Sequence, residues 1–549
     1  MNLDTTKTKK FKKIFEEILS ITTEKWNKNS LNKLLRKHKS SKQRIYRNDE
    51  LVEAYNALVS KKIIEKNKVL ENRIRLKPTR SNSGVAVVTV LTKPFPCIGK
   101  CIFCPNDPNM PKSYIASEPG AQRALLSKFD PYAQVFNRIV ALKKTGHNVE
   151  KIELIVLGGS WSVYPLDYRI WFVNECFKAM NDITAKSNEY VIPKKDSFKE
   201  TTWSKLEKNQ VRNEEAYCRN VGLVFETRPD CITKEEVISM RRLGATKVQI
   251  GIQTLSDEIA KQNNLGRGIR EVKNAFFLLR RAGFKIHGHW MVALYKSTPE
   301  IDKEGFKKLW EKDFCPDELK IYPTSVIPNT PLSKLYNEGK YIPYSTGKLI
   351  DVLESNIAST PRYCRLSRII RDIPSDEIEA GSKVTNLRQI VERNLKEKNV
   401  KINEIRSREI KGREINRDDL QLESIIYNTT VSTEYFISYK TKKDDLLCAF
   451  LRLSVPKTEY LRNNFIEELN GSSIVREIHV YGTIVGLKQK GHGESQHLGL
   501  GRMLIKEAEK VTKANNISKI SVISAIGTRK YYKSNAFAKG ELYMYKDLS

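Results

Sequence analysis

The chain has 549 residues, a length that predicts two or more domains of ordinary size. Hydrophobic residues make up 40% of the chain, which supplies large buried cores and argues against global disorder. No apolar run approaches the roughly 20 residues that span a bilayer, and the N-terminus lacks the pattern of a signal peptide. These totals predict a cytoplasmic protein with no membrane partner.

The formal net charge is +32, and residues 1–80 hold 22 Lys and Arg against 9 Asp and Glu. Such an excess attracts polyanions, of which nucleic acid is the commonest. The alternative source is AT-rich codon usage, because the chain is rich in Lys, Ile and Asn throughout. The concentration of charge at one end favours a DNA or RNA partner.

Residues 1–79 read as helices with basic faces. Residues 80–372 then contain six apolar, β-branched runs with helical segments between them, an alternation that predicts a parallel α/β sheet. The predicted strands are Val85–Thr92, Ile152–Gly158, Val221–Glu226, Lys247–Thr254, Lys285–Leu294 and Leu319–Ile327. Six units make a partial (β/α)6 barrel, in which ligands bind at the carboxyl ends of the strands.

Residues 373–399 are polar and charged, and we interpret them as a linker or a helical bridge. The sequence pattern of residues 400–549 predicts an α+β domain with antiparallel strands. Its predicted strands are Tyr435–Tyr439, Leu446–Leu453, Ile474–Thr483, Lys519–Ser524 and Glu541–Tyr545, with a helix that starts at Arg502.

Three of the nine cysteines, Cys97, Cys101 and Cys104, lie on one loop after the first predicted strand. Three thiolates with this spacing can hold three irons of a 4Fe–4S cluster. The fourth iron would stay open to bind and reduce S-adenosylmethionine, which is radical chemistry that no side chain performs. A structural zinc site needs a fourth ligand, and a redox Cys-x-x-Cys pair would leave Cys97 surplus.

Polar residues or glycines lie at the carboxyl ends of the next three predicted strands. Gly158, Gly159 and Ser160 follow the second strand, and Glu226 and Gln253 end the third and fourth. Glycine lets a ligand approach the backbone closely, and radical enzymes hold the methionine amino group at this place. Each residue could instead have a structural task, but their shared position at carboxyl ends predicts one pocket for S-adenosylmethionine.

A second motif, Gln496-His-Leu-Gly499-Leu500-Gly501-Arg502, leads into a predicted helix. Successive backbone N–H groups and the helix dipole suit a pyrophosphate. The order of apolar strand, glycine loop and helix is that of acetyltransferases of the acetyl-coenzyme A superfamily. The alternative is a glycine loop that is merely structural.

Three further side chains could serve catalysis in this second domain. Tyr531 or Tyr532 could protonate a leaving thiolate, and His479, in the preceding strand, could act as a base. Paired tyrosines are also ordinary packing residues, and a histidine in an apolar strand is more often part of a core.

The two motif sets, in this order, resemble the Elongator protein 3 family, the catalytic subunit of Elongator. The resemblance runs from about residue 76 to the end. It rests on the cysteine loop with its short, bacterial or archaeal first gap, and on Gly146–Lys151, Glu226–Asp230, Lys320–Pro323, Arg371–Pro374, Ser473–Gly482, Gln496–Gly501 and Gly527–Tyr532.

The resemblance implies a radical S-adenosylmethionine enzyme that places a carboxymethyl group on carbon 5 of the wobble uridine of tRNA. Acetyl-coenzyme A would be the carbon donor, its methyl group activated by a 5′-deoxyadenosyl radical and its thioester then hydrolysed. The family pattern assigns cluster binding to Cys97, Cys101 and Cys104. It assigns acetyl-coenzyme A binding to Lys151, Glu477, Ile478, His479, Val480, Leu500, Gly501, Arg502 and Tyr532.

The basic N-terminal helices and the barrel rim would hold the tRNA, whose flipped anticodon base can reach such a pocket. A homodimer or Elongator-like partner subunits are compatible with the sequence but not required by it. One rival function is a protein lysine acetyltransferase with the barrel as scaffold, and another is a non-catalytic RNA-binding subunit.

Overall fold

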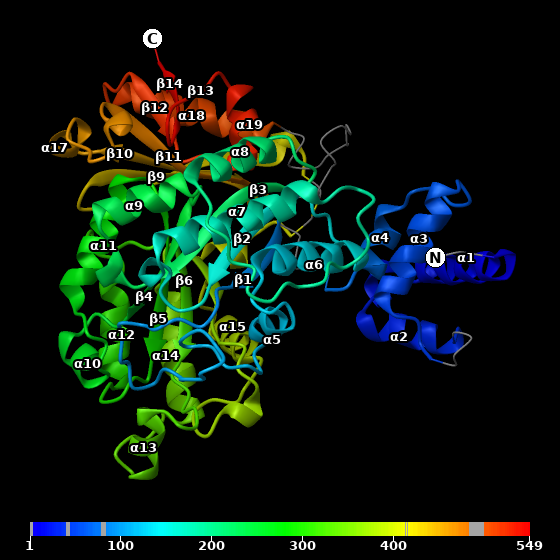
Figure 1. The fold of residues 1–549 in the computed structure, drawn as a ribbon, viewed down its shortest axis with the longest axis horizontal. Helices are drawn as coiled ribbons and strands as arrows, with labels where there is room; N and C mark the ends of the chain where they lie inside the picture. Colours follow the sequence, from blue (N-terminus) through cyan, green and yellow to red (C-terminus); the bar gives the residue numbers. More distant parts are fainter. Residues whose placement is uncertain are drawn as a thin grey trace.

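The computed structural model describes residues 4–39, 44–77, 84–411, 413, 415–481 and 499–548. Figure 1 shows three parts: a group of helices on one side, a barrel in the centre and a second sheet across one end of the barrel. None of the helices in these ranges combines the length and apolarity needed to cross a membrane.

The N-terminal helices are amphipathic and enclose a small core of their own. Their bounds are α1 (Thr5–Ser20), η1 (Thr23–Lys25), α2 (Lys28–Lys37), α3 (Asn48–Ser60) and α4 (Lys68–Ile74). Phe11, Phe15, Leu51 and Tyr55 lie in this core, which is separate from that of the barrel. Because the apolar faces turn inward, the lysines and arginines of α1 and α2 are left on the surface.

The barrel sheet is parallel and open, with its strands in sequence order. They are β1 (Ala86–Leu91), β2 (Lys151–Leu157), β3 (Arg219–Thr227), β4 (Lys247–Gln253), β5 (Lys285–Val292), β6 (Glu318–Pro323) and β7 (Arg365–Arg368). All six predicted strands are confirmed, and the partial barrel with them. The seventh, β7, was not predicted because its four residues, Arg-Leu-Ser-Arg, are short and polar.

Helices cover the outside of this sheet (Figure 1). They are α5 (Pro119–Leu126), α6 (Pro131–Lys144), η3 (Trp161–Val163), α7 (Leu166–Asp182), α8 (Trp203–Asn213), η4 (Pro229–Cys231), α9 (Lys234–Arg242), α10 (Asp257–Gln262), α11 (Ile269–Arg281), α12 (Pro299–Lys308), α13 (Pro331–Asn337) and α14 (Thr346–Ala358). Most begin at a Ser, Thr or Asp whose side chain accepts a backbone N–H, as Asp130 does before α6 and Ser345 before α14.

The strands β4, β5 and β6 alternate between apolar and polar residues. Val248, Ile250, Ile286, Leu319 and Ile321 point outward into the core. The residues between them line the lumen: Lys247, Gln249, Lys285, His287, His289, Glu318 and Lys320. Since side chains alternate across a strand, this pattern builds a barrel with an apolar outside and a charged interior.

The segment after β7 contains η5 (Ser375–Glu377), α15 (Leu387–Glu397), α16 (Ile405–Arg408) and η6 (Arg417–Asp419). Leu387, Val391 and Leu395 of α15 are buried, and Asn394 and Lys398 both donate to Glu354 of α14. The domain boundaries at residues 79, 372 and 399 stay predictions.

The C-terminal sheet is mixed, in the order β13-β14-β12-β11-β10-β9-β8. Its strands are β8 (Leu420–Asn428), β9 (Ser432–Thr441), β10 (Leu447–Pro456), β11 (Ser472–Val480), β12 (Lys519–Val522), β13 (Ala538–Lys539) and β14 (Met544–Asp547). Its helices are α17 (Thr458–Leu461), η7 (Glu467–Leu469), α18 (Leu500–Ala514), η8 (Ile526–Thr528) and α19 (Arg529–Lys533). The predicted strands each overlap one of these, whereas β8 and β13 were not predicted.

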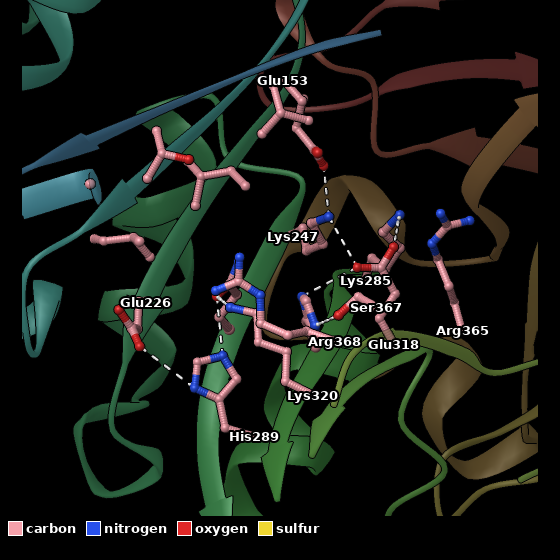
Figure 2. Close-up of a pocket in the computed structure, with 18 of the residues that line it drawn as sticks. Glu153, Glu226, Lys247, Lys285, His289, Glu318, Lys320, Arg365, Ser367 and Arg368 are labelled. Carbon is pink, nitrogen blue, oxygen red and sulfur yellow. Dashed lines mark hydrogen bonds and ion pairs between the residues drawn. The ribbon is translucent and has the colours of Figure 1, made fainter. Parts of the chain in front are cut away.

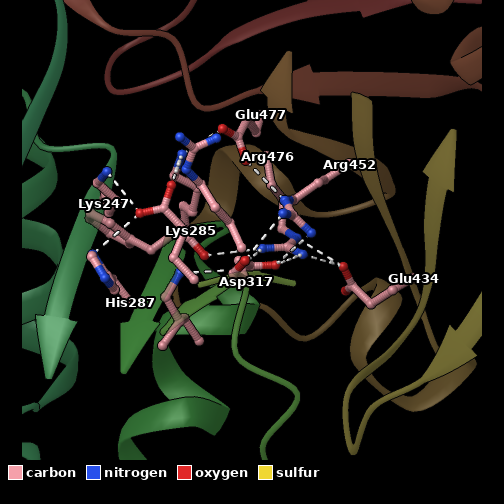
Figure 3. Close-up of polar contacts among 12 residues, drawn as sticks. Lys247, Lys285, His287, Asp317, Glu434, Arg452, Arg476 and Glu477 are labelled. Carbon is pink, nitrogen blue, oxygen red and sulfur yellow. Dashed lines mark hydrogen bonds and ion pairs between the residues drawn. The ribbon is translucent and has the colours of Figure 1, made fainter. Parts of the chain in front are cut away.

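Buried ion pairs join the two sheets at the floor of the barrel, where the barrel strands begin (Figure 3). Asp317, just before β6, accepts two hydrogen bonds of 2.8 Å from Arg476 of β11. Arg280 of α11 and Arg452 of β10 lie 3.3 and 3.5 Å from the same carboxylate. Burial would raise the pKa of Asp317, but the three guanidinium groups outweigh burial and hold it well below its usual value.

Replacing Asp317 with Asn should strongly destabilise the fold. Among the described residues, the three buried arginines would keep only Glu434 and Glu477 as carboxylate partners, and breaking a buried ion pair costs about 3–5 kcal/mol. The urea midpoint, followed by circular dichroism, measures this. Asp351→Asn is the control, because Asp351 is 63% exposed and its pair with Lys303 is worth at most about 1 kcal/mol. Equal midpoints for the two variants would refute the interpretation.

Candidate functional site

One cavity of about 1450 Å³ runs through the barrel lumen and reaches the C-terminal sheet. At one end it is lined by the cysteine loop, and at the other by β11 and the first turn of α18. Fifteen Lys and Arg line it against seven Asp and Glu, so its interior favours anionic ligands.

The three clustered cysteines all line this cavity. Their thiols are free, and burial raises the pKa of Cys104 to about 12. Burial also raises the pKa of Cys101, although Arg228 and Arg267 oppose it. A Cβ on Gly99, between the cysteines, would collide with the guanidinium of Arg228, which would have to move aside.

The three thiols fit a 4Fe–4S cluster. In a cubane cluster each thiolate binds a different iron, so the sulfurs need not surround one point. No group of three His, Cys, Asp or Glu in the described ranges is arranged to hold a single metal ion. The thiols would lose their protons on binding iron, and the two arginines would stabilise the negative charge.

The strand-end residues gather beside the cysteines. Gly158 and Gly159 have φ of +133° and +90°, which favour glycine, and a Cβ on Gly158 would strike Thr92. Ser160 Oγ lies 3.8 Å from Cys97 Sγ. Gly159 and Ser160 line the cavity, whereas Gly158 does not and instead shapes the turn.

Gln253 and Glu226 line the same end of the cavity. Gln253 has φ of +63°, a strained conformation for a residue with a side chain, and its buried Oε1 has no hydrogen-bond partner among the described residues. Glu226 accepts a 2.7 Å hydrogen bond from the buried hydroxyl of Tyr114. An unsatisfied buried oxygen that faces a cavity can accept a hydrogen bond from a ligand.

Charged side chains fill the lumen between the two ends (Figure 2). Near the floor, Lys247 lies 2.6 Å from Glu153 and 3.1 Å from Glu318, and Lys285 pairs with Glu318 and Glu477. Of these lumen residues, the sequence analysis singled out only Glu477 and missed Glu153, Lys247, Lys285 and Glu318. The signal was present in the strict alternation of polar and apolar residues along β4, β5 and β6.

The other end of the cavity is built around the start of α18. Gly499 caps the helix with φ of +70°, and Gly501 and Arg502 of the first turn line the cavity. A Cβ on Gly501 would lie 2.5 Å from the hydroxyl of Tyr531, so a side chain there would displace that hydroxyl. Leu500 is buried beneath the cavity and does not line it, and Gln496 lies outside the described residues.

The remaining predicted residues of this domain also meet the cavity: Lys151, Glu477, Ile478, His479, Val480, Tyr531 and Tyr532. Burial lowers the pKa of His479 to about 4, so its imidazole is neutral near pH 7. Its Nε2 is buried without a hydrogen-bond partner in the described chain. Burial also lowers the pKa of Lys151, on the floor of the barrel, and raises that of Tyr532.

Comparisons with known proteins agree with this architecture. The Radical SAM superfamily profile matches residues 96–302, and the Radical_SAM C-terminal domain matches residues 316–397. The tRNA uridine(34) acetyltransferase of Methanocaldococcus infernus is 36% identical over 499 residues, covering 88% of this chain and 89% of that protein. The chain belongs to the Elongator complex protein 3 family.

Elongator complex protein 3 of Saccharomyces cerevisiae is 32% identical over 545 residues, which cover 96% of this chain and 93% of that protein. A solved structure, the archaeal Methanocaldococcus infernus Elp3 with an N-terminal deletion, superimposes with a TM-score of 0.71 at 34% identity. The superposition covers 85% of this chain and 99% of the archaeal chain. The family's radical SAM domain implies a 4Fe–4S cluster and S-adenosylmethionine, which the cysteine end of the cavity can hold.

Cys101→Ala should abolish the cluster without unfolding the barrel, because the cysteine loop lies at the mouth of the lumen. Iron and sulfide analysis after anaerobic reconstitution should find about four irons in the unchanged chain and almost none in the variant. Cys231→Ala is the matched control, since Cys231 is half-buried just beyond β3 but does not line the cavity. A full iron content in Cys101→Ala would contradict the assignment.

Proposed function

We propose that this protein is a radical S-adenosylmethionine enzyme that forms 5-carboxymethyluridine at the wobble uridine of tRNA, with acetyl-coenzyme A as carbon donor. The observation that carries the proposal is the single cavity lined both by the three cysteines and by the first turn of α18. A scaffold barrel would not need a continuous passage between these two motifs.

Acetyl-coenzyme A would enter at the floor of the barrel. The N–H groups at the start of α18 would bind its pyrophosphate, with Arg502 adding positive charge. Its pantetheine arm would follow β11 past Glu477, Ile478, His479 and Val480, with Lys151 opposite. The orphaned His479 Nε2 supports a polar ligand at this point, because a buried nitrogen without a partner is costly.

The cysteine end would hold the cluster through Cys97, Cys101 and Cys104, and S-adenosylmethionine through Gly159, Ser160, Glu226 and Gln253. Bound together, these two groups supply one-electron chemistry that no side chain provides. The chain's own part is to hold the acetyl group and the base in the lumen between the two ends. Tyr531 and Tyr532 could protonate the departing thiolate, and neutral His479 could accept a proton.

The tRNA would lie across the basic N-terminal helices and the barrel rim, which would place its anticodon at the open edge of the sheet. Cations that line the cavity near that edge, such as Arg123, Arg138 and Arg368, suit the RNA backbone. The rival function, protein lysine acetylation, would require neither the cysteine loop nor the charged lumen.

The decisive experiment supplies anaerobically purified protein with reductant, S-adenosylmethionine, acetyl-coenzyme A and tRNA. Mass spectrometry of the digested nucleosides should find 5-carboxymethyluridine with the unchanged chain and none with Cys101→Ala. Formation of 5′-deoxyadenosine without any modified nucleoside would show that the barrel is active and that a partner or another substrate is missing. Acetylated lysine peptides produced equally by Cys101→Ala would establish the acetyltransferase instead.

Charge reversal on α2 should weaken tRNA binding without affecting the cluster. Lys33, Arg36 and Lys37 are exposed on the polar face of α2, and replacing all three with Glu leaves its apolar face intact. Because phosphate contacts dominate affinity, we expect a loss of about tenfold or more at low salt, together with a shallower salt dependence. The dissociation constant and iron content measure the two effects.

The control is the double variant Lys307→Glu and Lys308→Glu, on the exposed face of α12. It changes the net charge by four units rather than six but lies away from the N-terminal helices. If both variants weaken binding in proportion to charge alone, the N-terminal helices have no specific role.

A further inference from the structure

Lys320 differs from the other lysines inside the barrel. Lys247 and Lys285 each contact two carboxylates, whereas no carboxylate of the described residues lies within ion-pair distance of Lys320. Its Nζ donates one hydrogen bond, of 2.6 Å, to Gln249 Oε1. Burial lowers the pKa of Lys320 to about 8, although the more distant Glu226 opposes the change. Two of its N–H donors are therefore left for a ligand in the lumen.

The polar neighbours of Lys320 lie beside it at the same level along the barrel axis, and we call this group the polar ring (Figure 2). His289 Nε2 lies 3.1 Å from Gln249 Oε1, and His289 Nδ1 lies 3.5 Å from Glu226. The strand register places His289 directly beside Lys320 and Gln249 beside Glu226. Within the described chain Gln249 Nε2 donates no hydrogen bond, so this ring presents donors from both Lys320 and Gln249 to the lumen.

The position of the ring limits what can bind there. Lys320 lies two residues further along β6 than Glu318 of the floor, on the side of the cysteine loop. The ligand is therefore held between the cluster end and the acetyltransferase end. It must offer hydrogen-bond acceptors to Lys320 and Gln249, as the carbonyl oxygens of a pyrimidine base do.

We propose that Lys320 and Gln249 form the subsite for the uracil base and select it over cytosine. This inference rests on the proposed function. Uracil presents an oxygen at position 4, whereas cytosine presents an amino group there. An ammonium group can only donate hydrogen bonds, so Lys320 donates to the oxygen of uracil and repels the amino group of cytosine. An unstacked RNA base is commonly read in this way on its pairing edge.

The thioester oxygen of acetyl-coenzyme A is the other carbonyl that could reach Lys320. The paired floor residues Lys247, Glu318, Lys285 and Glu477 lie closer than Lys320 to the first turn of α18. An acetyl group that enters from that side reaches them before Lys320, which makes the base the better occupant. Arg368 lies close enough to Lys320 to lower its pKa and also lines the cavity, where it can neutralise a phosphate of the entering nucleotide.

Photocrosslinking tests the placement directly. An anticodon stem-loop with 4-thiouridine at position 34 is bound to the reconstituted protein, irradiated and mapped by mass spectrometry. The crosslinked residue should lie in β4, β5 or β6, on the lumen side. A crosslink confined to the N-terminal helices or to β11 and α18 would overturn the proposal.

Variants test the selection. The unchanged chain should bind a U34 stem-loop about tenfold or more tightly than a C34 stem-loop, and Lys320→Met should reduce this ratio to about twofold or less. Lys320→Gln should also lose the preference, because an amide both donates and accepts. Lys308→Met, on exposed α12, is the matched control and should keep the full ratio.

Iron content and circular dichroism establish that each variant is folded. If Lys320→Met does not fold, Lys320→Gln tests the preference in its place. Unchanged preference in both variants would refute the subsite. Loss of acetyl-coenzyme A affinity without loss of the U34 preference would instead place Lys320 on the thioester. A crosslink in the lumen without any carboxymethyluridine product would retain the uracil subsite while refuting the proposed reaction, so the two failures are distinguishable.

Discussion

The buried carboxylate of Asp317 and its three arginines fix the architecture on which the rest depends. Asp317 lies at the start of a barrel strand, whereas Arg452 and Arg476 come from the C-terminal sheet. Ion pairs of this kind are costly to desolvate and tolerate little change in geometry, so they specify one relative placement of the two sheets. That placement turns two separate ligand motifs into the two ends of one cavity.

The lumen follows from the same constraint. A barrel interior is ordinarily filled by apolar side chains, but here it is lined by lysines, histidines, glutamates and a glutamine. Charged groups persist there because each floor residue has a partner, as Lys247 has in Glu153 and Glu318. The apolar residues of the same strands face the helices, so the fold keeps a normal core outside the barrel.

Partnered and unpartnered groups divide the cavity into structural and ligand-binding parts. Lys247 and Lys285 are satisfied by carboxylates, and they stabilise the floor. Gln253 Oε1 and His479 Nε2 have no partner within the described chain, and Lys320 has spare donors. Because unsatisfied buried groups are costly, these three positions are the ones that we propose as ligand contacts.

Much of this protein can be read from its sequence. The spacing of Cys97, Cys101 and Cys104, the glycine loop before α18 and the six alternating apolar runs predicted the cofactor class and the barrel. These features are local, since a few neighbouring residues suffice to define a metal-binding loop, a helix N-terminus or a buried strand. The short strand β7 and the edge strand β8 escaped prediction because neither carries a strong apolar pattern.

Other features were decided only by the tertiary structure. Sequence order cannot show that Asp317 meets Arg476, 159 residues away, or that Lys320 lacks the carboxylate that Lys247 has. These facts depend on which strands pair and in which register, because a shift of one residue would turn the lumen residues into the apolar core. The sequence by itself determined which chemistries are present, and only the packing of the two sheets brought them together around one cavity.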